Sequence, residues 1–350
     1  MNTKITAAST NARYLSSDTD MLLAEEAYQN FEETLLDKIN RVRTDYPGYH
    51  DYIYNIADIG HDPYVLISIL SAVKPGFKLS DPEIKNMFHI MEHPRHQYTL
   101  TITKVVAPSY QADYGDKSID NVPPMYLDLQ ISLKNYDLFC TVDSILTHDQ
   151  LAAYAGYMRS RGGRPDLFPQ DKYPHATLPE PLMPFHVPAT IRQAFPALKR
   201  ELEIAEPLVG YPYVWGGGDI ETSFDCSGFI DYVMDQMGYH FRNSISGKQW
   251  RLPVAGSRIN GQFYDGIYEK CIPIDCSEAQ PGDLVFFTGS FEAGYRKHNL
   301  THVGFYMGDD VFLGCNSSTG ISFQPYSKID KRGRTWQQKL VCYGKLPPLK

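Results

Sequence analysis

The sequence has 350 residues, a length that accommodates two domains of ordinary size, each with its own core. Its net charge of -8 argues against nucleic-acid binding, because affinity for a phosphate backbone requires a basic surface. No uninterrupted apolar run reaches the length of about 18 residues that a membrane-spanning helix needs. Residues 1–20 are polar and lack the apolar core of a signal peptide.

Composition along the chain predicts four segments. Residues 1–20 are expected to be a disordered tail, and residues 21–161 to form a small α+β accessory domain. Residues 162–188 contain seven prolines and are expected to be a stiff, extended linker. Residues 189–347 are expected to form a second domain.

Three helices are predicted before the first strand of the accessory domain. Between residues 24 and 43 the apolar side chains recur every three or four positions, which is typical of an amphipathic helix. Proline directly follows Asp62 and Asp81, and this pair of residues marks a helix start because proline fits the first turn.

Two strands and a further helix are predicted next. Apolar residues alternate with polar ones over 98–102 and 127–133, the pattern of strands with one buried face. Thr147 and Gln150 form a capping box that predicts a helix from about 148 to 161. No catalytic group of residues gathers in this part of the chain.

The six cysteines do not form a compact disulfide framework, and no CxxC pair suggests zinc. His298 and His302 are four residues apart, but no third metal ligand accompanies them. We therefore expect neither a metal nor another cofactor. Most of the cysteines are interpreted as small buried hydrophobic residues.

Cys226 is the exception. It follows Asp225 and begins a segment whose apolar residues fall at 229, 230, 233, 234 and 237, the pattern of one helix face. A thiol in the first turn of a helix lies near unpaired backbone amides and the positive end of the helix dipole, which favour the nucleophilic thiolate.

A cysteine nucleophile requires a general base, and His302 is the candidate. It begins an apolar run to Gly308 that predicts a strand, and residues 281–287 predict a turn followed by another strand. A helix that carries the cysteine, packed on strands that carry the histidine, is the arrangement that a Cys-His pair requires.

Four motifs, PYVWGG, DCSGF, QPGDLVFF and HVGFYMG, occur in this order within residues 200–347. Together they resemble the NlpC/P60 peptidases. The resemblance implies a papain-like α+β core, with helices against a curled antiparallel sheet. It also implies hydrolysis of peptidoglycan stem peptides, commonly between D-glutamate and a diamino acid, through a thioester intermediate.

The resemblance assigns the nucleophile to Cys226 and the base to His302. It also implies that residues near the nucleophile bind the substrate, with the Cys226 amide donating to the oxyanion. Trp215 either contacts the substrate or forms part of a tightly packed turn. The proposed substrate-binding residues are Tyr213, Trp215, Asp225 and Ser227.

One position departs from the family pattern. The family places a polar residue about twelve positions after the base to orient the imidazole, and here that position is Gly314. Asn316 takes the role if the register shifts by two residues. Cys315 is the neighbouring alternative, and the position is otherwise unfilled.

Three functions therefore stay open: a peptidoglycan endopeptidase, a weak or inactive wall-peptide-binding module, and an amidase that cleaves N-acetylmuramoyl-L-alanine. The fragments DYPGYHDY, IGHDPY and QYTLTIT resemble the accessory part of cell-wall hydrolases from conjugative elements of Gram-positive bacteria. This resemblance implies a conjugation-machinery partner and an extracellular or cell-wall location. No nucleic-acid partner is expected.

Overall fold

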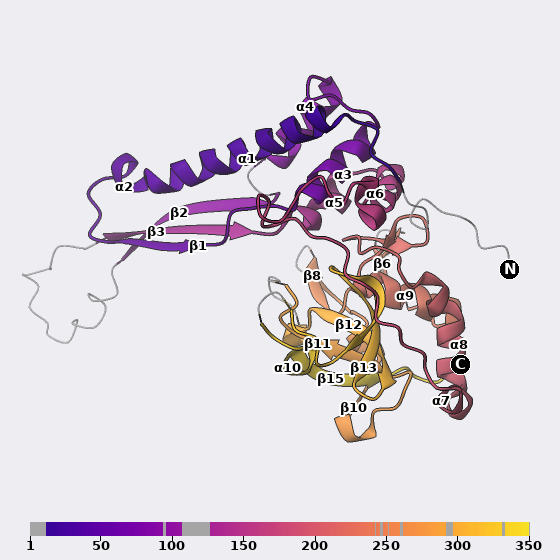
Figure 1. Cartoon of the computed structure of the whole chain (residues 1–350). Helices are drawn as coiled ribbons and strands as arrows, with labels where there is room; N and C mark the ends of the chain where they lie inside the picture. The colour runs from indigo at the N-terminus through magenta and orange to yellow at the C-terminus, as the bar shows by residue number, and fades with distance from the viewer. Residues whose placement is uncertain are drawn as a thin grey trace, which may run out of the picture. The chain divides into compact units, whose positions relative to one another are not determined.

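The computed structural model describes residues 12–93, 96–106, 127–241, 243–245, 248–250, 252–259, 262–291, 297–330 and 333–349. The chain divides into two compact units. The N-terminal unit comprises Leu15–Ile145 and Leu167–Ala176, and the C-terminal unit comprises Met1–Tyr14, Leu146–Asp166 and Thr177–Lys350. Both combine helices with a sheet, so the predicted α+β class is confirmed (Figure 1).

The helices of the N-terminal unit begin where the sequence places capping residues. Ser17 caps the first helix and accepts a hydrogen bond from the Asp20 amide, and Asp62 does the same for the Tyr64 amide. The prediction of a disordered tail is wrong for residues 18–20, which form the first turn of that helix; residues 1–11 lie outside the described residues. The helices are α1 (Asp18–Asn40), α2 (Val42–Asp45), α3 (Pro63–Val73), α4 (Pro82–Met91), η3 (Leu138–Thr141) and α5 (Val142–Ile145).

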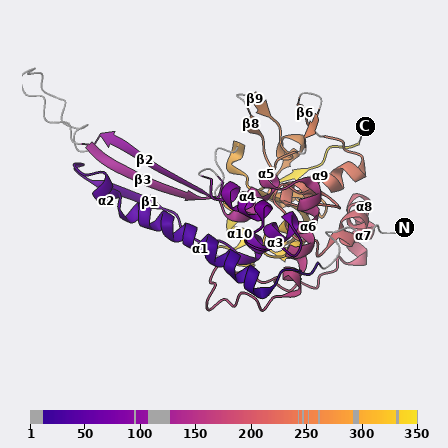
Figure 2. The same ribbon diagram turned by 90° about the horizontal axis from the view of Figure 1, so that it is seen from above.

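The sheet of this unit has the order β1-β3-β2. The predicted strands are confirmed and longer than expected, as β2 (Tyr98–Val106) and β3 (Leu127–Asn135), which pair antiparallel. A third strand, β1 (Tyr52–Ile56), was not predicted and lies parallel to β3. α1 runs along the sheet in both views (Figures 1 and 2), and its apolar face packs on alternating residues of β2 and β3, as the periodicities predicted.

The C-terminal unit contains α6 (His148–Ser160), α7 (Ala189–Ala194), α8 (Pro196–Ala205), α9 (Cys226–Met237) and α10 (Trp336–Lys339). Its 3-10 turns are η4 (Arg161–Gly163), η5 (Glu206–Leu208), η6 (Tyr268–Lys270), η7 (Cys276–Glu278) and η8 (Lys297–Asn299). The predicted capping box of Thr147 and Gln150 begins α6. Among the described helices, none combines the length and apolar character that crossing a bilayer requires.

The compact units do not follow the predicted domain limits. α6 and residues 177–188 associate with the C-terminal unit, although the sequence placed them in the accessory domain and the linker. Contacts explain this: the Arg161 guanidinium donates to the Thr177 carbonyl at 2.7 Å, and Lys328 pairs with Glu180 at 2.6 Å. The assignment of an accessory domain stays a prediction.

A six-stranded antiparallel sheet forms the centre of the C-terminal unit, in the order β10-β15-β11-β12-β13-β14. α9 packs against β12 and β13, with the ring of Phe229 on that of Phe305. The strands are β10 (Ile272–Ile274), β11 (Leu284–Phe287), β12 (His302–Gly308), β13 (Val311–Asn316), β14 (Gly320–Pro325) and β15 (Leu340–Lys345).

Three two-stranded ladders accompany this sheet. They are β4 (Gly218–Asp219) with β5 (Ser223–Phe224), β6 (Asn243–Ile245) with β7 (Lys248–Trp250), and β8 (Ser257–Ile259) with β9 (Gln262–Tyr264). The helix that begins at Cys226 and the strand that begins at His302 thus exist with the predicted starts, and they pack together.

Candidate active site

Cys226 occupies the first position of α9. Asp225 is the N-cap, and its Oδ1 accepts hydrogen bonds from the Gly228 amide at 2.8 Å and from the Ser227 hydroxyl at 2.9 Å. Cys226 is buried, with 7% of its surface exposed. The thiol therefore lies at the positive end of the helix dipole, as the sequence predicted.

The PYVWGG loop is fastened to the start of this helix. The Gly216 amide donates to Oδ2 of Asp225 at 3.1 Å, and Gly216 has a positive φ of 80° that favours glycine. Tyr213 forms a bridge with Phe224, and the half-buried Trp215 packs edge-on against Phe291 at 5.1 Å. The loop and the nucleophile are therefore held as one local structure.

The predicted substrate-binding residues divide into two kinds. Asp225 and Ser227 are buried and hydrogen-bonded within the helix start, so their visible contacts are structural. Tyr213 and Trp215 are half-buried, with surface left to meet another molecule. Substrate binding by all four residues stays a prediction.

The two residues predicted as nucleophile and base, Cys226 and His302, lie at neighbouring positions in the structure. Sγ of Cys226 lies 4.0 Å from the carbonyl oxygen of Thr301, which is the residue directly before His302. His302 opens β12 and is 4% exposed. The start of the helix and the start of the strand therefore meet at this point.

The environment of His302 keeps its imidazole neutral. Burial lowers its pKa to about 3, and the positive charge of Lys339 adds to the effect, while Asn316 and Asp225 act in the opposite direction. A neutral imidazole is the form that accepts a proton, so His302 is in the protonation state of a general base at neutral pH.

The register of the sheet places Asn316 beside His302. β12 pairs with β13 through Phe305 and Leu313, and continuing this antiparallel register by three residues brings Asn316 opposite His302. Side chains alternate between the faces of a strand, so Cys315 points the other way, and its Sγ lies 3.1 Å from the Phe224 carbonyl oxygen. The placement favours Asn316 over Cys315; its orienting role stays a prediction.

The contact between His302 and Asn316 is loose. Within the described part of the chain, Nε2 of His302 and Oδ1 of Asn316 are both buried without a partner at full hydrogen-bonding geometry. The Asn316 side chain still raises the pKa of His302 through a hydrogen-bonding interaction, so the two groups lie near one another.

The aromatic residues that surround the His302 imidazole were not predicted from the sequence. Trp336 of α10 stacks on His302 with ring centroids 4.8 Å apart, and Phe287 and Phe312 contact it at 5.9 Å. Trp336 lies 34 residues beyond His302 in sequence and belongs to none of the four motifs. Its capping box of Thr335 and Gln338 is visible in the sequence, but that signal indicates a helix rather than a contact.

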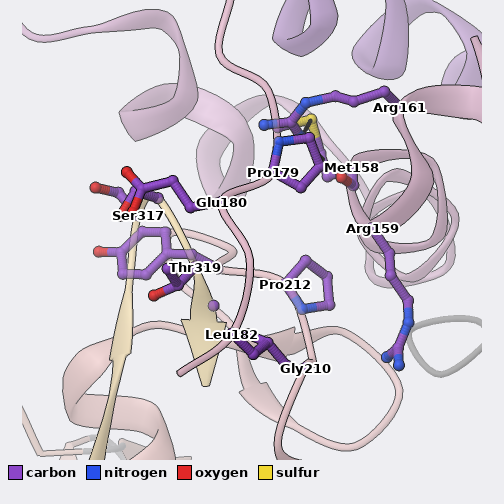
Figure 3. Close-up of a pocket in the computed structure, with 13 residues that line it drawn as sticks. Met158, Arg159, Arg161, Pro179, Glu180, Leu182, Gly210, Pro212, Ser317 and Thr319 are labelled. Carbon is purple, nitrogen blue, oxygen red and sulfur yellow. Dashed lines mark hydrogen bonds between the residues drawn. The ribbon is translucent and has the colours of Figure 1, made fainter. Parts of the chain in front are cut away.

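A pocket of about 250 Å³ lies between the PYVWGG loop and the segments that the sequence assigned to the accessory domain and the linker (Figure 3). Tyr213 lines it, as does the β13–β14 turn, which directly follows Asn316. In Figure 3, Pro212 and Leu182 lie beside Gly210, and the side chain of Arg159 borders the same space. Among the described residues, no group of three or more His, Cys, Asp and Glu side chains is placed to hold a metal ion.

The comparison with protein families matches residues 210–345 to the model of the NlpC/P60 family. The match covers less than half of the chain. The matched residues contain Cys226, His302 and Asn316, and they leave out α6 and the proline-rich segment that line the other side of the pocket. The predicted resemblance is thus confirmed for the C-terminal part of the chain.

Two curated relatives are similar to this part. The bifunctional muramidase/DL-endopeptidase CwlT of Bacillus subtilis (strain 168) is 33% identical over 139 residues, covering 39% of this chain and 33% of that protein. The probable endopeptidase p60 of Listeria grayi is 33% identical over 154 residues, covering 44% of this chain and 23% of that protein. The chain thus spans a third or less of the length of these relatives.

This chain is also similar to a solved structure from Staphylococcus aureus subsp. aureus Mu50, a lipoprotein-like protein of the NLP/P60 family. It is 22% identical, with a TM-score of 0.33, and the match covers 58% of this chain and 63% of that one.

Proposed function

We propose that the protein is a cysteine endopeptidase that hydrolyses a peptide bond in the stem peptides of bacterial peptidoglycan. The observation that carries the proposal is the thiol of Cys226 at the start of α9, 4.0 Å from the carbonyl group that precedes the buried His302. The family of residues 210–345 and the names of the two relatives, both endopeptidases, support the same substrate class.

The proposed chemistry uses the two side chains in turn. Nε2 or Nδ1 of His302 accepts the thiol proton while Sγ of Cys226 attacks the scissile carbonyl carbon. The amide of Cys226 donates to the developing oxyanion, because the first amides of a helix have no partner within it. The C–N bond breaks, the leaving amine takes the proton from the imidazolium, and water then hydrolyses the thioester to a free carboxylate.

We further propose that the bond lies between D-glutamate and the diamino acid of the stem peptide. The name of the Bacillus relative, a DL-endopeptidase, supports this choice. The half-buried Tyr213 and Trp215 are proposed to contact the stem peptide, with the pocket beside Tyr213 as one place for it. A wall or extracellular location follows from this substrate. A conjugation-machinery partner of the N-terminal unit rests on the sequence fragments alone.

Digestion of purified peptidoglycan tests the proposal. Mass spectrometry is expected to find new peptides with a free D-glutamyl carboxylate and a free amine on the diamino acid, and Cys226→Ala is expected to abolish them. Equal release by Cys226→Ala rejects the proposal. New muramoyl carboxylates with free L-alanine amines instead indicate an amidase.

The loose contact between His302 and Asn316 favours a second candidate, a module that binds wall peptides without cutting them. The rate of alkylation of Cys226 by iodoacetamide separates the two. A reaction that follows an ordinary thiol pKa of about 8.5 supports the binding module, and a reaction that persists well below that pH supports the enzyme.

A further inference from the structure

Three aromatic rings enclose the imidazole of His302, and together we name them the aromatic box: Trp336, Phe312 and Phe287. Trp336 lies nearly parallel to the imidazole, at 4.8 Å and 27°, whereas Phe312 meets it edge-on at 5.9 Å and 77°. Phe287 is tilted at 44° and also lies 5.9 Å away. Aromatic pairs at these separations attract one another beyond the burial of their area.

Two glycines, Gly304 within β12 and Gly314 within β13, leave space for the Phe312 ring of this box. A Cβ atom at Gly304 would lie 2.5 Å from the Phe312 ring, and a Cβ atom at Gly314 would lie 3.0 Å from the same ring. Any larger side chain at either position would displace Phe312. The Phe312 ring thus occupies the space into which a side chain at Gly304 or Gly314 would project.

Trp336 is itself held from more than one direction. The capping box of Thr335 and Gln338 fixes the start of its helix. The ammonium group of the buried Lys339 lies 4.5 Å from the Trp336 ring centroid and forms an ion pair with Asp330 at 2.5 Å. A cation near an indole attracts it, and more strongly where water is excluded.

We propose that Trp336 is a positioning residue that holds the imidazole of His302 toward Cys226, in addition to the loose contact that Asn316 makes with the same ring. The inference rests on the proposed role of His302 as general base. Trp336 does not touch the substrate in this scheme; it acts through His302.

The need for such a residue follows from the freedom of a histidine side chain. Rotation about its terminal torsion has only broad minima, so an imidazole without a firm hydrogen bond samples many orientations. Nε2 of His302 lacks such a bond among the described residues. A flat indole at stacking distance restricts that rotation, and the position of a reacting group matters: a displacement of about 1 Å costs roughly 100-fold in rate.

Three single variants test the proposal on a soluble stem-peptide substrate. Trp336→Leu removes the flat ring, Trp336→Phe keeps one, and Tyr306→Leu removes a ring from the same hydrophobic cluster that has no described ring contact with His302. We expect Trp336→Leu to lower kcat roughly 10- to 100-fold with little change in KM. Trp336→Phe is expected to restore most of the loss, and Tyr306→Leu to keep the wild-type kcat.

A spectroscopic measurement keeps the test independent of activity. In the folded wild-type protein the imidazole Cε1 proton of His302, assigned by its loss in His302→Gln, is expected upfield because it lies over the indole. It is expected to move downfield in Trp336→Leu and to stay in place in Tyr306→Leu.

The outcomes that overturn the inference are distinct from those that overturn the proposed function. If wild type cleaves and Trp336→Leu cleaves equally well, or if Tyr306→Leu loses as much kcat, Trp336 has no positioning role. If wild type does not cleave, the proposed function fails. In that case an unshifted Cε1 signal in Trp336→Leu rejects the stacking as well.

Discussion

Two buried histidines, one in each unit, have opposite protonation states. His61 in the N-terminal unit lies between two carboxylates, with Nε2 2.9 Å from Glu25 and Nδ1 3.1 Å from Glu32. Burial lowers the pKa of His61, but the two carboxylates outweigh it and raise the pKa to about 9. The pKa of His302 in the C-terminal unit falls to about 3 through burial and the charge of Lys339.

The comparison shows that burial alone does not predict what a histidine does. Both side chains lose hydration of the charged form, and the sign of the net shift depends on the charges that face the ring. A histidine between carboxylates stays a cation and joins helix α1 to the segment before α3. A histidine among aromatic rings stays neutral and is free to accept a proton.

The largest expected effect is on cleavage activity, which should depend on His302 and not on His61. His302→Gln removes the proposed base, so kcat/KM for a stem peptide is expected to fall by roughly 100- to 10,000-fold while the protein stays folded. His61→Gln, made in parallel and assayed below its unfolding transition, is expected to cleave at the wild-type rate. A large loss from His61→Gln, or none from His302→Gln, would reverse the assignment of the two histidines.

For the free energy of unfolding, the substitution at His61 is expected to have the larger effect. His61→Gln leaves Glu25 and Glu32 buried without their cation, which costs about 3–5 kcal/mol when one partner of a buried pair is removed. Hydrogen exchange of the α1 amides in urea, read by mass spectrometry, reports this unit separately. Adding Glu25→Gln and Glu32→Gln to His61→Gln is expected to recover much of the loss; a failure to recover would locate the stabilisation outside the charge pairs.

The raised pKa of His61 also predicts a pH window. A group whose pKa is higher in the folded state stabilises it fully below the unfolded value of about 6.5, and loses this contribution as the pH rises through about 9. The N-terminal unit is therefore expected to lose about 3 kcal/mol of unfolding free energy between these pH values. The same exchange measurement at pH 6, 7.5 and 9 checks it, with His61→Gln as the pH-independent reference.

The lowered pKa of His302 predicts a cleavage rate that depends little on pH between pH 7 and pH 5. An ordinary histidine is mostly protonated at pH 5, which would reduce the activity of a general base by roughly 30-fold. The charged and polar groups identified as shifting the pKa of this ring are Lys339, Asn316 and Asp225. Because the net shift is downward, kcat/KM is expected to change little between pH 7 and pH 5; a rate that halves near pH 6.5 would show an unshifted imidazole.

Local sequence rules predicted several of the elements that carry these residues, but not the contacts of the two histidines. The helix start at Cys226, the strand from His302 and the capping box of Thr147 and Gln150 follow from local rules, and the structure has them where they were predicted. Local rules also place the apolar face of α1 against the strands. These features depend on residues within one or two turns of each other.

The rest depends on contacts between residues far apart in the chain. Nothing local indicates that Trp336 would stack on His302, or that Glu25 and Glu32 would meet His61. The boundary at 161 was placed by a glycine pair and a run of prolines, yet Lys328 pairs with Glu180 of that run, which belongs to the C-terminal unit. The counting of twelve residues pointed to Gly314, whereas the antiparallel register, continued from Phe305, points to Asn316.

The smallest expected effect concerns Asn316, and it sharpens the contrast between the two histidines. His61 is fixed by two close charged partners, whereas His302 has one loose amide and the aromatic box. If the box supplies most of the positioning, Asn316→Ala removes about 0.5–1.5 kcal/mol of transition-state stabilisation, a loss of roughly 2- to 10-fold in kcat/KM. Combining it with Trp336→Leu is expected to cost more than the sum of the two single changes, because each residue restrains the same ring when the other is absent. A loss of 1,000-fold from Asn316→Ala alone would instead identify the amide as the main restraint.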